Sequence, residues 1–235
     1  MSKDYGLQGV LNMRDAAAAG AGHPGGGREG LLLRSAAPRP GEGVPAGMPW
    51  PPAVVVDLRS ERESGTDPYR WTDRTTVRRF SIHDNARLPG ELPPSVDWPR
   101  VYGEILDGFG AVAAQVLHLA AHAQGGPTLV HCAAGKDRAG VVAAALLLLG
   151  GVDARWVLAD YLASRAAIPA IAARLAAEQE NVDERTWIAS PWADLTEEAF
   201  AAIPAGFGHG GAPAWFTDHG ADPADIAAWR HRLTG

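Results

Sequence analysis

The segment that most restricts the fold of this chain runs from residue 127 to residue 149. It opens with the apolar, strand-like run 127–130, passes through the small-residue stretch Cys132–Arg138, and continues into the unbroken apolar run 141–149, which suits a buried helix. The first N–H groups of a helix have no partner inside the helix, so a strand that turns into a helix in this way forms a cradle for an anion. With a thiol at its start and an arginine six positions later, the turn is predicted to hold a phosphate dianion over a thiolate.

Composition limits the class of protein. The 235 residues are 46% hydrophobic, which is enough for a packed core, and the single cysteine excludes an intramolecular disulfide framework and a Cys-rich zinc site. A net charge of −6 argues against a nucleic-acid partner, because nucleic-acid-binding domains carry a basic face. We predict one domain, with an N-terminal segment 1–52 rich in loops, a catalytic core 53–164 and a helical part 165–235.

The length and position of the apolar runs also bear on the cellular location of the protein. Residues 1–10 carry no apolar signal-peptide core, and the most apolar window, 141–149, is far shorter than the roughly 20 residues that span a bilayer. We therefore expect no integral membrane segment and a cytoplasmic location by default. Leaderless export and the oligomeric state stay open.

Periodicity predicts strands and helices in alternation. The expected strands are 31–33, 53–56, 77–82 and the run that ends at residue 131, and the expected helices are 101–122, 141–149, 153–162, 166–177 and two more that start at about 194 and 222. Asp153, Asp194 and Asp222 are expected to cap the helices that follow them, Asp194 in a capping box with Glu197. The fold class is thus α/β, with a small, mostly parallel central sheet flanked by helices and extra helices at the C-terminus.

The loop carries the groups that phosphate chemistry needs. The thiolate form of Cys132 is favoured by the helix N-terminus and by the side chains of His131, Lys136 and Arg138. Small residues at 133–135 let successive N–H groups converge on phosphate oxygens, and a planar guanidinium can hold two oxygens at once. Attack by sulfur would give a cysteinyl-phosphate, which water would split in a second step.

Two plainer interpretations compete with this one. A cysteine that only packs in the core leaves the charged triplet Lys136–Arg138 unexplained. A nucleotide-triphosphate loop fails because its pattern needs glycine at Val130 and Ser or Thr at Asp137.

His131–Arg138 resembles the signature of Cys-dependent phosphatases, and its Gly-Lys-Asp-Arg sequence is most similar to the bacterial atypical tyrosine phosphatases that also accept phosphoinositides. Other stretches resemble further motifs of this branch, in the same order along the chain: Asn12-Met13-Arg14-Asp15, Leu33-Arg34-Ser35-Ala36, Val56-Asp57-Leu58-Arg59-Ser60 with Glu63, and Asp160-Tyr161 through Ser164. The resemblance implies the Cys-phosphatase type of α/β fold.

The resemblance also implies roles. Cys132 would be the nucleophile and Arg138 the phosphate clamp, with Lys136 adding positive charge at the rim. The phosphate-binding residues would be Ala133, Ala134, Gly135, Lys136, Asp137 and Arg138. The implied substrate is a phosphotyrosine protein or a phosphoinositide, and no metal or organic cofactor is implied.

Two departures from the family pattern matter. Ala139 stands where the family usually has Thr or Ser, whose hydroxyl supports the leaving sulfur, so we expect slower hydrolysis of the phosphoenzyme. Residues 16–18 are Ala-Ala-Ala instead of Leu-Gly-Gly, which puts the shape of the N-terminal segment in doubt.

The leaving oxygen needs a general acid, and four aspartates compete for that role. Asp57 ends a predicted strand, where the sites of parallel sheets open, and the resemblance also points to it. Asp137 lies in the loop but could equally orient Arg138. Asp97 and Asp84 precede the loop on separate segments. The expected order places Asp57 first, then Asp137 and Asp97.

The remaining conspicuous residues have plainer interpretations. We expect Arg14, Asp15 and Arg34 to form an ion-pair network beside the loop. His118 and His122 have the spacing of a metal pair on a helix, but no third ligand is evident in the sequence. Tryptophans suit packing, although Trp71 and Trp98 could line the mouth of the pocket.

The sequence therefore predicts a phosphate-monoester hydrolase, most simply a protein-tyrosine phosphatase that works through a cysteinyl-phosphate. Two alternatives stay open. The first is a phosphoinositide phosphatase. The second is a phosphate-binding module with weak turnover, which the missing hydroxyl at Ala139 would favour.

Overall fold

A five-stranded sheet in the order β1-β2-β5-β3-β4 lies at the centre of the computed structural model. The structure describes residues 9–64, 69–82, 95–178 and 182–235. β2, β5, β3 and β4 run parallel to one another, and β1 is antiparallel to β2. The strands are β1 (Arg14–Asp15), β2 (Leu32–Ala36), β3 (Val54–Asp57), β4 (Thr76–Arg79) and β5 (Thr128–Cys132). The expected mostly parallel α/β sheet is confirmed.

The carboxyl ends of the three inner strands meet at one edge. Every residue of β5 is buried, as expected of a parallel strand that is covered on both faces. In the register of the sheet, Ala36 of β2 lies beside Cys132, and Asp57 of β3 lies beside His131. Open α/β sheets bind their ligands at this edge, because the turns that follow the strands converge there.

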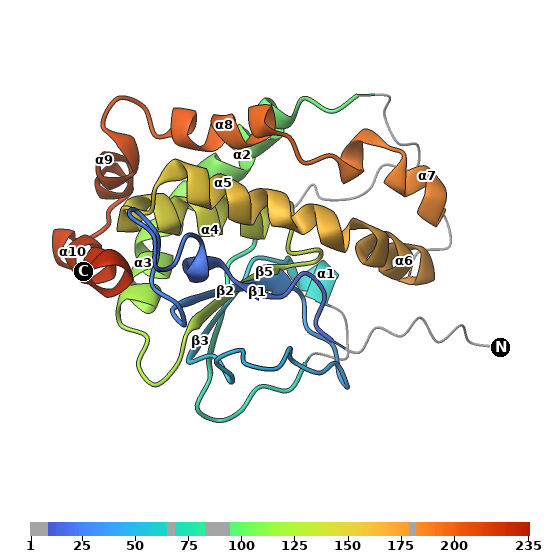
Figure 1. Ribbon diagram of the computed structural model, residues 1–235, viewed down its shortest axis with the longest axis horizontal. Helices are drawn as coiled ribbons and strands as arrows, with labels where there is room; N and C mark the ends of the chain where they lie inside the picture. The colour runs from blue at the N-terminus through green and yellow to red at the C-terminus, as the bar shows by residue number, and fades with distance from the viewer. Residues whose placement is uncertain (1–8, 65–68, 83–94, 179–181) are drawn as a thin grey trace.

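Helices pack on one face of the sheet and loops on the other (Figure 1). α4 (Asp137–Gly150) follows the turn after β5 and is buried along nearly its whole length. On the opposite face, a small apolar cluster is covered by loop residues rather than by a second helical layer; it contains Leu33, Val55 and Leu129 under Met13, Met48, Trp50 and Trp71. The other helices are α1 (Glu61–Ser64), α2 (Trp98–Gly110), α3 (Ala113–Ala121), α5 (Ala154–Ala163), α6 (Ile168–Glu178), α7 (Glu184–Ile188), α8 (Glu197–Gly206), α9 (Gly211–Asp218) and α10 (Pro223–Thr234).

The helix expected over 101–122 is two helices. α2 ends at Gly110, and α3 continues from Ala113 at an angle of 71°. A Cβ atom at Gly110 would lie 2.5 Å from the ring of His219, so glycine allows the C-terminal part of the chain to pack at the bend. None of the helices in the described residues is long and apolar enough to cross a membrane, although the bent pair α2 and α3 passes on combined length and composition.

The predicted helix starts are confirmed at two positions and wrong at one. The carboxylates of Asp153 and Asp222 accept the backbone N–H of Arg155 and Ala224 at the starts of α5 and α10. α8 is instead capped by Thr196, whose hydroxyl accepts the N–H of Ala199. Thr196 lies directly before Glu197-Glu198, so the helix begins two residues later than an Asp194 cap would place it, and the hydroxyl binds an orphan N–H group of that later first turn.

Candidate active site

The turn between β5 and α4 packs tightly against the end of β2. Cys132 ends β5 with 2% of its surface exposed, and α4 begins at Asp137. Gly135 has a φ angle of +67°, and a Cβ atom there would lie 2.3 Å from the carbonyl carbon of Ser35. Both the backbone conformation and the close approach to β2 therefore require glycine at this position.

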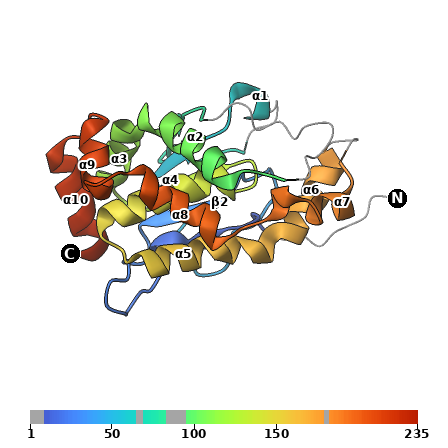
Figure 2. The same cartoon turned by 90° about the horizontal axis from the view of Figure 1, so that it is seen from above.

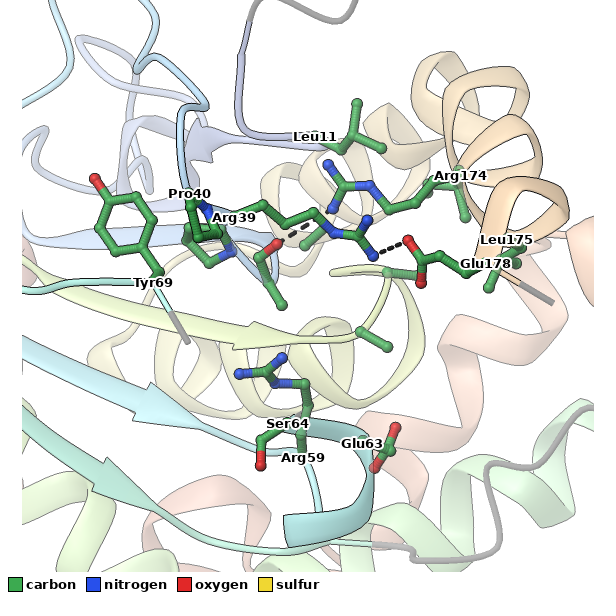
Figure 3. A pocket seen from close by; sticks show the side chains of 16 residues that line it. Leu11, Arg39, Pro40, Arg59, Glu63, Ser64, Tyr69, Arg174, Leu175 and Glu178 are labelled. Carbon is green, nitrogen blue, oxygen red and sulfur yellow. Dashed lines mark hydrogen bonds and ion pairs between the residues drawn. The ribbon is translucent and has the colours of Figure 1, made fainter. Parts of the chain in front are cut away.

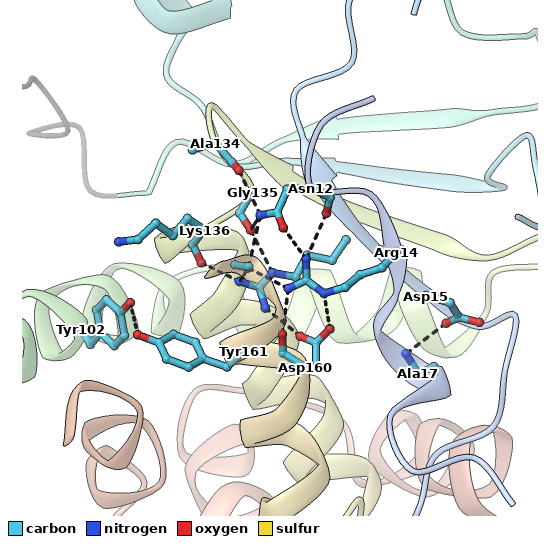
Figure 4. Close-up of polar contacts among 12 residues, drawn as sticks. Asn12, Arg14, Asp15, Ala17, Tyr102, Ala134, Gly135, Lys136, Asp160 and Tyr161 are labelled. Atoms are coloured by element: carbon cyan, nitrogen blue, oxygen red, sulfur yellow. Dashed lines mark hydrogen bonds and ion pairs between the residues drawn. The ribbon is translucent and has the colours of Figure 1, made fainter. Parts of the chain in front are cut away.

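Side chains from distant segments hold the carbonyl groups of this turn on its outer side (Figure 4). The amide of Asn12 donates to the carbonyl oxygens of Ala134 and Gly135, at 3.2 and 2.9 Å. The guanidinium of Arg34 donates to the carbonyl oxygens of Gly135 and Lys136, at 2.9 and 2.7 Å. Since each peptide group points its N–H away from its carbonyl, this arrangement favours N–H groups that face the inside of the turn.

Arg138 is held in one orientation by Glu63. Its two terminal nitrogens donate to the two carboxylate oxygens of Glu63, at 2.7 and 2.5 Å, and Nη1 also donates to the carbonyl oxygen of Leu58 at 3.3 Å. A guanidinium has five N–H donors, so two have no hydrogen-bond partner among the described residues, one on Nε and one on Nη2. These two lie on the same side edge and form a fork that matches two oxygens of a phosphate.

Contact between Arg138 and Glu63 shifts the pKa of each side chain in the direction that keeps it charged. Burial alone would lower the pKa of Arg138, but the hydrogen bonds that it donates to Glu63 and its electrostatic attraction to Cys132 and Glu63 raise it above its ordinary value. Burial would likewise raise the pKa of Glu63, yet Arg138 holds it below its ordinary value. The side chain that could bind an anion is thus permanently cationic.

The loop lysine does not lie at the rim. The side chain of Lys136 is buried, with Nζ 4.3 Å from the centre of the Trp98 ring and 2.9 Å from Oδ1 of Asp137. The same oxygen of Asp137 accepts the Tyr102 hydroxyl at 2.9 Å. The positive charge of Lys136, which was expected at the rim, is therefore buried and paired with a carboxylate. Asp137 binds Lys136 rather than orienting Arg138.

Asp57 is enclosed by positive charge at the end of β3. Arg59 donates to both of its carboxylate oxygens at 2.9 Å and also through its backbone N–H, and Nε of Arg79 lies 3.3 Å away. Although burial would raise the pKa of Asp57, these contacts with Arg59 hold it below its ordinary value. The carboxyl is ionised in this arrangement.

An open cavity of about 510 Å³ reaches the loop at Ala133 and Ala134 (Figure 3). Its wall carries the charged side chains of Arg39, Arg59, Glu63, Arg174 and Glu178, together with Tyr69. Arg39 pairs with Glu178, which also lines the cavity, and Arg174 pairs with Glu42. This volume is in the range of pockets that take a molecule much larger than a phosphate ion.

The chain matches a known protein family over almost its full length. A family model described as the tyrosine phosphatase family matches residues 5–235. The chain belongs to the tyrosine phosphatase family. It is also 47% identical, over 53 residues, to the triple specificity protein phosphatase PtpB of Mycobacterium tuberculosis (strain ATCC 25618 / H37Rv). That match covers 23% of this chain and 19% of the relative, so it spans about a fifth of the relative's length.

The family membership confirms the resemblance of the motifs, and the structure brings those motifs together. Asp160 of α5 accepts Nε of Arg14 at 2.6 Å and Nη1 of Arg34 at 2.7 Å, and both arginines also bond the hydroxyl of Ser164. Burial would raise the pKa of Asp160, but the two arginines hold it below its ordinary value. The N-terminal, β2 and α5 motifs of this tyrosine phosphatase family member thus form a single support beneath the loop.

Asp15, which was predicted to join the ion-pair network with Arg14 and Arg34, lies outside that network. The carboxylate of Asp15 accepts the backbone N–H of Ala17 at 3.1 Å and of Gly30 at 2.6 Å, and burial raises its pKa. It caps a short 3-10 helix, Ala16–Ala18, which is the segment where the sequence departs from the family pattern. Asp15 therefore shapes the N-terminal segment and does not pair with the arginines.

His131 does not supply positive charge to the cysteine. Its ring is buried and stacked on Trp71, with Nδ1 3.7 Å from the nearer oxygen of Asp57. Burial lowers the pKa of His131 to about 4, so the ring is neutral at neutral pH. The positive charge near Cys132 therefore comes from the start of α4 and from Arg138 rather than from His131.

The remaining sequence candidates have other positions. Asp97 is exposed and caps α2 by accepting the N–H of Arg100, whereas Asp84 lies outside the described residues. Trp98 packs against Lys136 and Trp192 inside the protein. Neither Trp98 nor Trp71 belongs to the wall of the cavity, whose aromatic residue is Tyr69.

Two residues that touch this site had no role assigned from sequence. Glu63 lies 75 residues from Arg138, and Asn12 lies 122 residues from Ala134. Both fall within stretches that resemble family motifs, which was the available signal. Asn12 also has a φ angle of +55° and is the only residue other than glycine with a positive φ in the part of the chain that the structure describes.

Proposed function

We propose that this protein hydrolyses phosphate monoesters through a cysteinyl-phosphate at Cys132. The observation that carries the proposal is the state of Arg138, which is buried, cationic and fixed by Glu63 with one edge free, at the end of the turn that Cys132 begins. A side chain held in this way before substrate arrives needs little reorganisation in the transition state.

In the first step the Cys132 sulfur attacks phosphorus and the bond from phosphorus to the leaving oxygen breaks. The free edge of Arg138 and the N–H groups of the turn bind the equatorial oxygens, where charge is spread in the transition state. In the second step a water molecule attacks phosphorus, the bond from sulfur to phosphorus breaks, and inorganic phosphate leaves.

We assign the proton donor to Asp137 ahead of Asp57. A donor must carry a proton when the leaving oxygen departs, and the two contacts with Arg59 oppose protonation of Asp57. Asp137 lies in the loop itself, is partly exposed and binds one cation, Lys136, through Oδ1, whereas Asp57 contacts two arginines. Asp97, which caps α2, is third.

The proposed substrate is phosphotyrosine in a protein, because the cavity beside the loop can take an extended group and carries the aromatic ring of Tyr69. A phosphoinositide is the alternative, and the observation in its favour is the presence of Arg39, Arg59 and Arg174 around the same cavity. A relative matched over 53 residues is named a triple specificity phosphatase, which is compatible with either class.

Activity of the purified protein tests the proposal. We expect hydrolysis of p-nitrophenyl phosphate that resists EDTA, is inhibited by vanadate and is abolished by Cys132→Ser. Full activity in Cys132→Ser would exclude the mechanism. Turnover of phosphotyrosine peptides compared with inositol lipids then decides between the two substrate classes, and near-zero turnover on both would favour the phosphate-binding module.

A further inference from the structure

Two histidines and one aspartate converge at the junction of α3 and α10. His118 and His122 lie one turn apart on α3, and Asp225 comes from the first turn of α10, more than a hundred residues later in the sequence. Nδ1 of His118 lies 2.9 Å from Oδ2 of Asp225, and Nε2 of His122 lies 2.7 Å from Oδ1. The structure therefore supplies the third ligand that the sequence alone did not indicate.

The donor atoms of these three side chains have the spacing of a metal site. One ligand atom from each residue lies within 4.8 Å of the others. A tetrahedral zinc ion with bonds of about 2.1 Å separates its ligand atoms by about 3.4 Å. The present N–O distances of 2.9 and 2.7 Å would have to widen by about 0.5 and 0.7 Å, which rotation of two exposed imidazole rings can provide.

The cluster is accessible from solvent but anchored at its base. The imidazoles of His118 and His122 are 63% and 51% exposed, whereas the Asp225 side chain is 13% exposed. His118 also lines an open cavity of about 360 Å³ between β4 and α3. An ion can therefore reach the cluster, and one or more positions would stay open to water, as in zinc sites with three protein ligands.

We propose that His118, His122 and Asp225 bind a divalent transition-metal ion such as Zn²⁺, which links the C-terminal helix α10 to α3. Nitrogen from two imidazoles and oxygen from one carboxylate suit zinc better than calcium or magnesium, which prefer ligand sets made only of oxygen. The ion would reinforce a junction where Arg232 of α10 already donates to the carbonyl oxygens of Ala121 and Ala123.

This site is separate from the phosphate loop. His122 lies at the end of α3, before the start of β5, whereas the loop follows the end of β5. α4 extends from the loop toward α10 and is about 21 Å long at 1.5 Å per residue. Figures 1 and 2 show α3 and α10 side by side at the end of the molecule opposite α6 and α7. The ion would act on stability and not on the phosphate chemistry.

Metal binding to the full chain tests the proposal, with Cys132→Ser as the parent so that the thiol cannot bind the ion. We expect one Zn²⁺ per chain by calorimetry, and Co²⁺ should give the visible absorption of a four- or five-coordinate site. His118→Ala/His122→Ala should weaken binding about tenfold or more, since even the loss of an outer partner of a ligand costs about that much. His209→Ala, which removes an exposed histidine elsewhere, should bind like the parent.

Thermal unfolding gives a second readout. Zn²⁺ should raise the unfolding midpoint of the parent and of His209→Ala, and it should leave that of the double variant unchanged. If the double variant does not fold, Asp225→Asn serves in its place. Equal zinc affinity in parent and variant, or no binding to the parent, would overturn the proposal and reduce the cluster to an ion pair between two helices.

Discussion

Ala139 follows Arg138 at the start of α4, and its methyl group is completely buried. The proposed second step breaks the bond between sulfur and phosphorus, and no hydroxyl stands at this position to support the departing sulfur. A hydrogen bond to a charged group contributes about 1.5 kcal/mol or more, which corresponds to about tenfold in rate. The phosphoenzyme of this protein should therefore form quickly and hydrolyse slowly.

Ala139→Ser should relieve that delay. In the wild type we expect a burst of p-nitrophenol followed by slow steady turnover, and in the variant a smaller burst with steady turnover raised up to about tenfold. Stopped-flow absorbance measures both phases. Ala139→Gly is the matched control, because it also lacks a hydroxyl and should keep the burst. An unchanged burst in the serine variant would contradict the role of this position.

Asp137 and Asp57 can be separated by their dependence on the leaving group. Asp137→Asn should lower kcat/KM for phenyl phosphate about 100-fold and have a much smaller effect with p-nitrophenyl phosphate, whose phenolate leaves without a proton. Asp57→Asn should release Arg59 and affect both substrates to a similar degree. The reverse pattern in steady-state kinetics would restore Asp57 as the donor.

Sequence predicts those parts of the site that are contiguous in the chain. The turn from Cys132 to Arg138 is recognisable because strand, small residues and helix follow one another directly. The partner of Arg138 and the neutral state of His131 cannot be recognised in the sequence, because they depend on contacts and burial that form only when β3, β5 and α1 pack together. Lys136 shows the same limit, since Trp98 and Asp137 draw its ammonium group inward.

Asp160 joins α5 to β1 and β2. Its carboxylate binds Arg14 of β1 and Arg34 of β2 from its place on α5, and Arg34 in turn binds two carbonyl groups of the loop. Gly140 makes room for this arginine, because a Cβ atom there would lie 2.7 Å from the guanidinium. Removal of the carboxylate would leave two arginines, one of them fully buried, without a counter-charge.

Asp160→Asn should therefore lower the free energy of unfolding by about 3 to 5 kcal/mol at pH 7, the typical cost of breaking a buried ion pair. The folded-state pKa of Asp160 is lowered, so its contribution is present above the unfolded pKa of about 3.9 and is lost as pH falls through the folded pKa. Urea unfolding at pH 7 and at pH 3 should show the difference between wild type and variant shrinking at the lower pH.

Asp153→Asn is the control for this measurement. Asp153 caps the same helix from an exposed position, and asparagine caps helices as well as aspartate does, so stability should change little. A loss of stability in Asp160→Asn that is equally small would contradict the account of the support beneath the loop.

Element boundaries show where prediction from sequence stops. The order of strands and helices follows from periodicity, and the caps at Asp153 and Asp222 follow from local hydrogen bonding. The bend between α2 and α3 does not follow from periodicity, and the close approach of His219 to Gly110 at this bend joins residues that are far apart in the sequence. The polar residues Arg34 and Ser35 of β2 lie outside the predicted strand, because the contacts of Arg34 with the loop and with Asp160 form only in the folded protein.

Segments from both ends of the chain pack against the central strand β5 and the helix α4 that follows it. β1 and β2 come from the first 36 residues, and β2 pairs with β5 of the central part. From the C-terminal end, the indole of Trp229 in α10 donates to the carbonyl oxygen of Leu146 in α4 at 2.7 Å. The helix that carries the phosphate loop is thus fixed along its length by segments from both ends of the chain.

The central claim is that phosphate passes through the sulfur of Cys132. Rapid denaturation of the protein during turnover of p-nitrophenyl phosphate, followed by mass spectrometry, tests this directly, and the single cysteine makes the assignment unambiguous. We predict one phosphoryl group on Cys132 in the wild type and none in Cys132→Ser. Turnover without any phosphoryl group on the protein, or with one on another residue, would contradict the account.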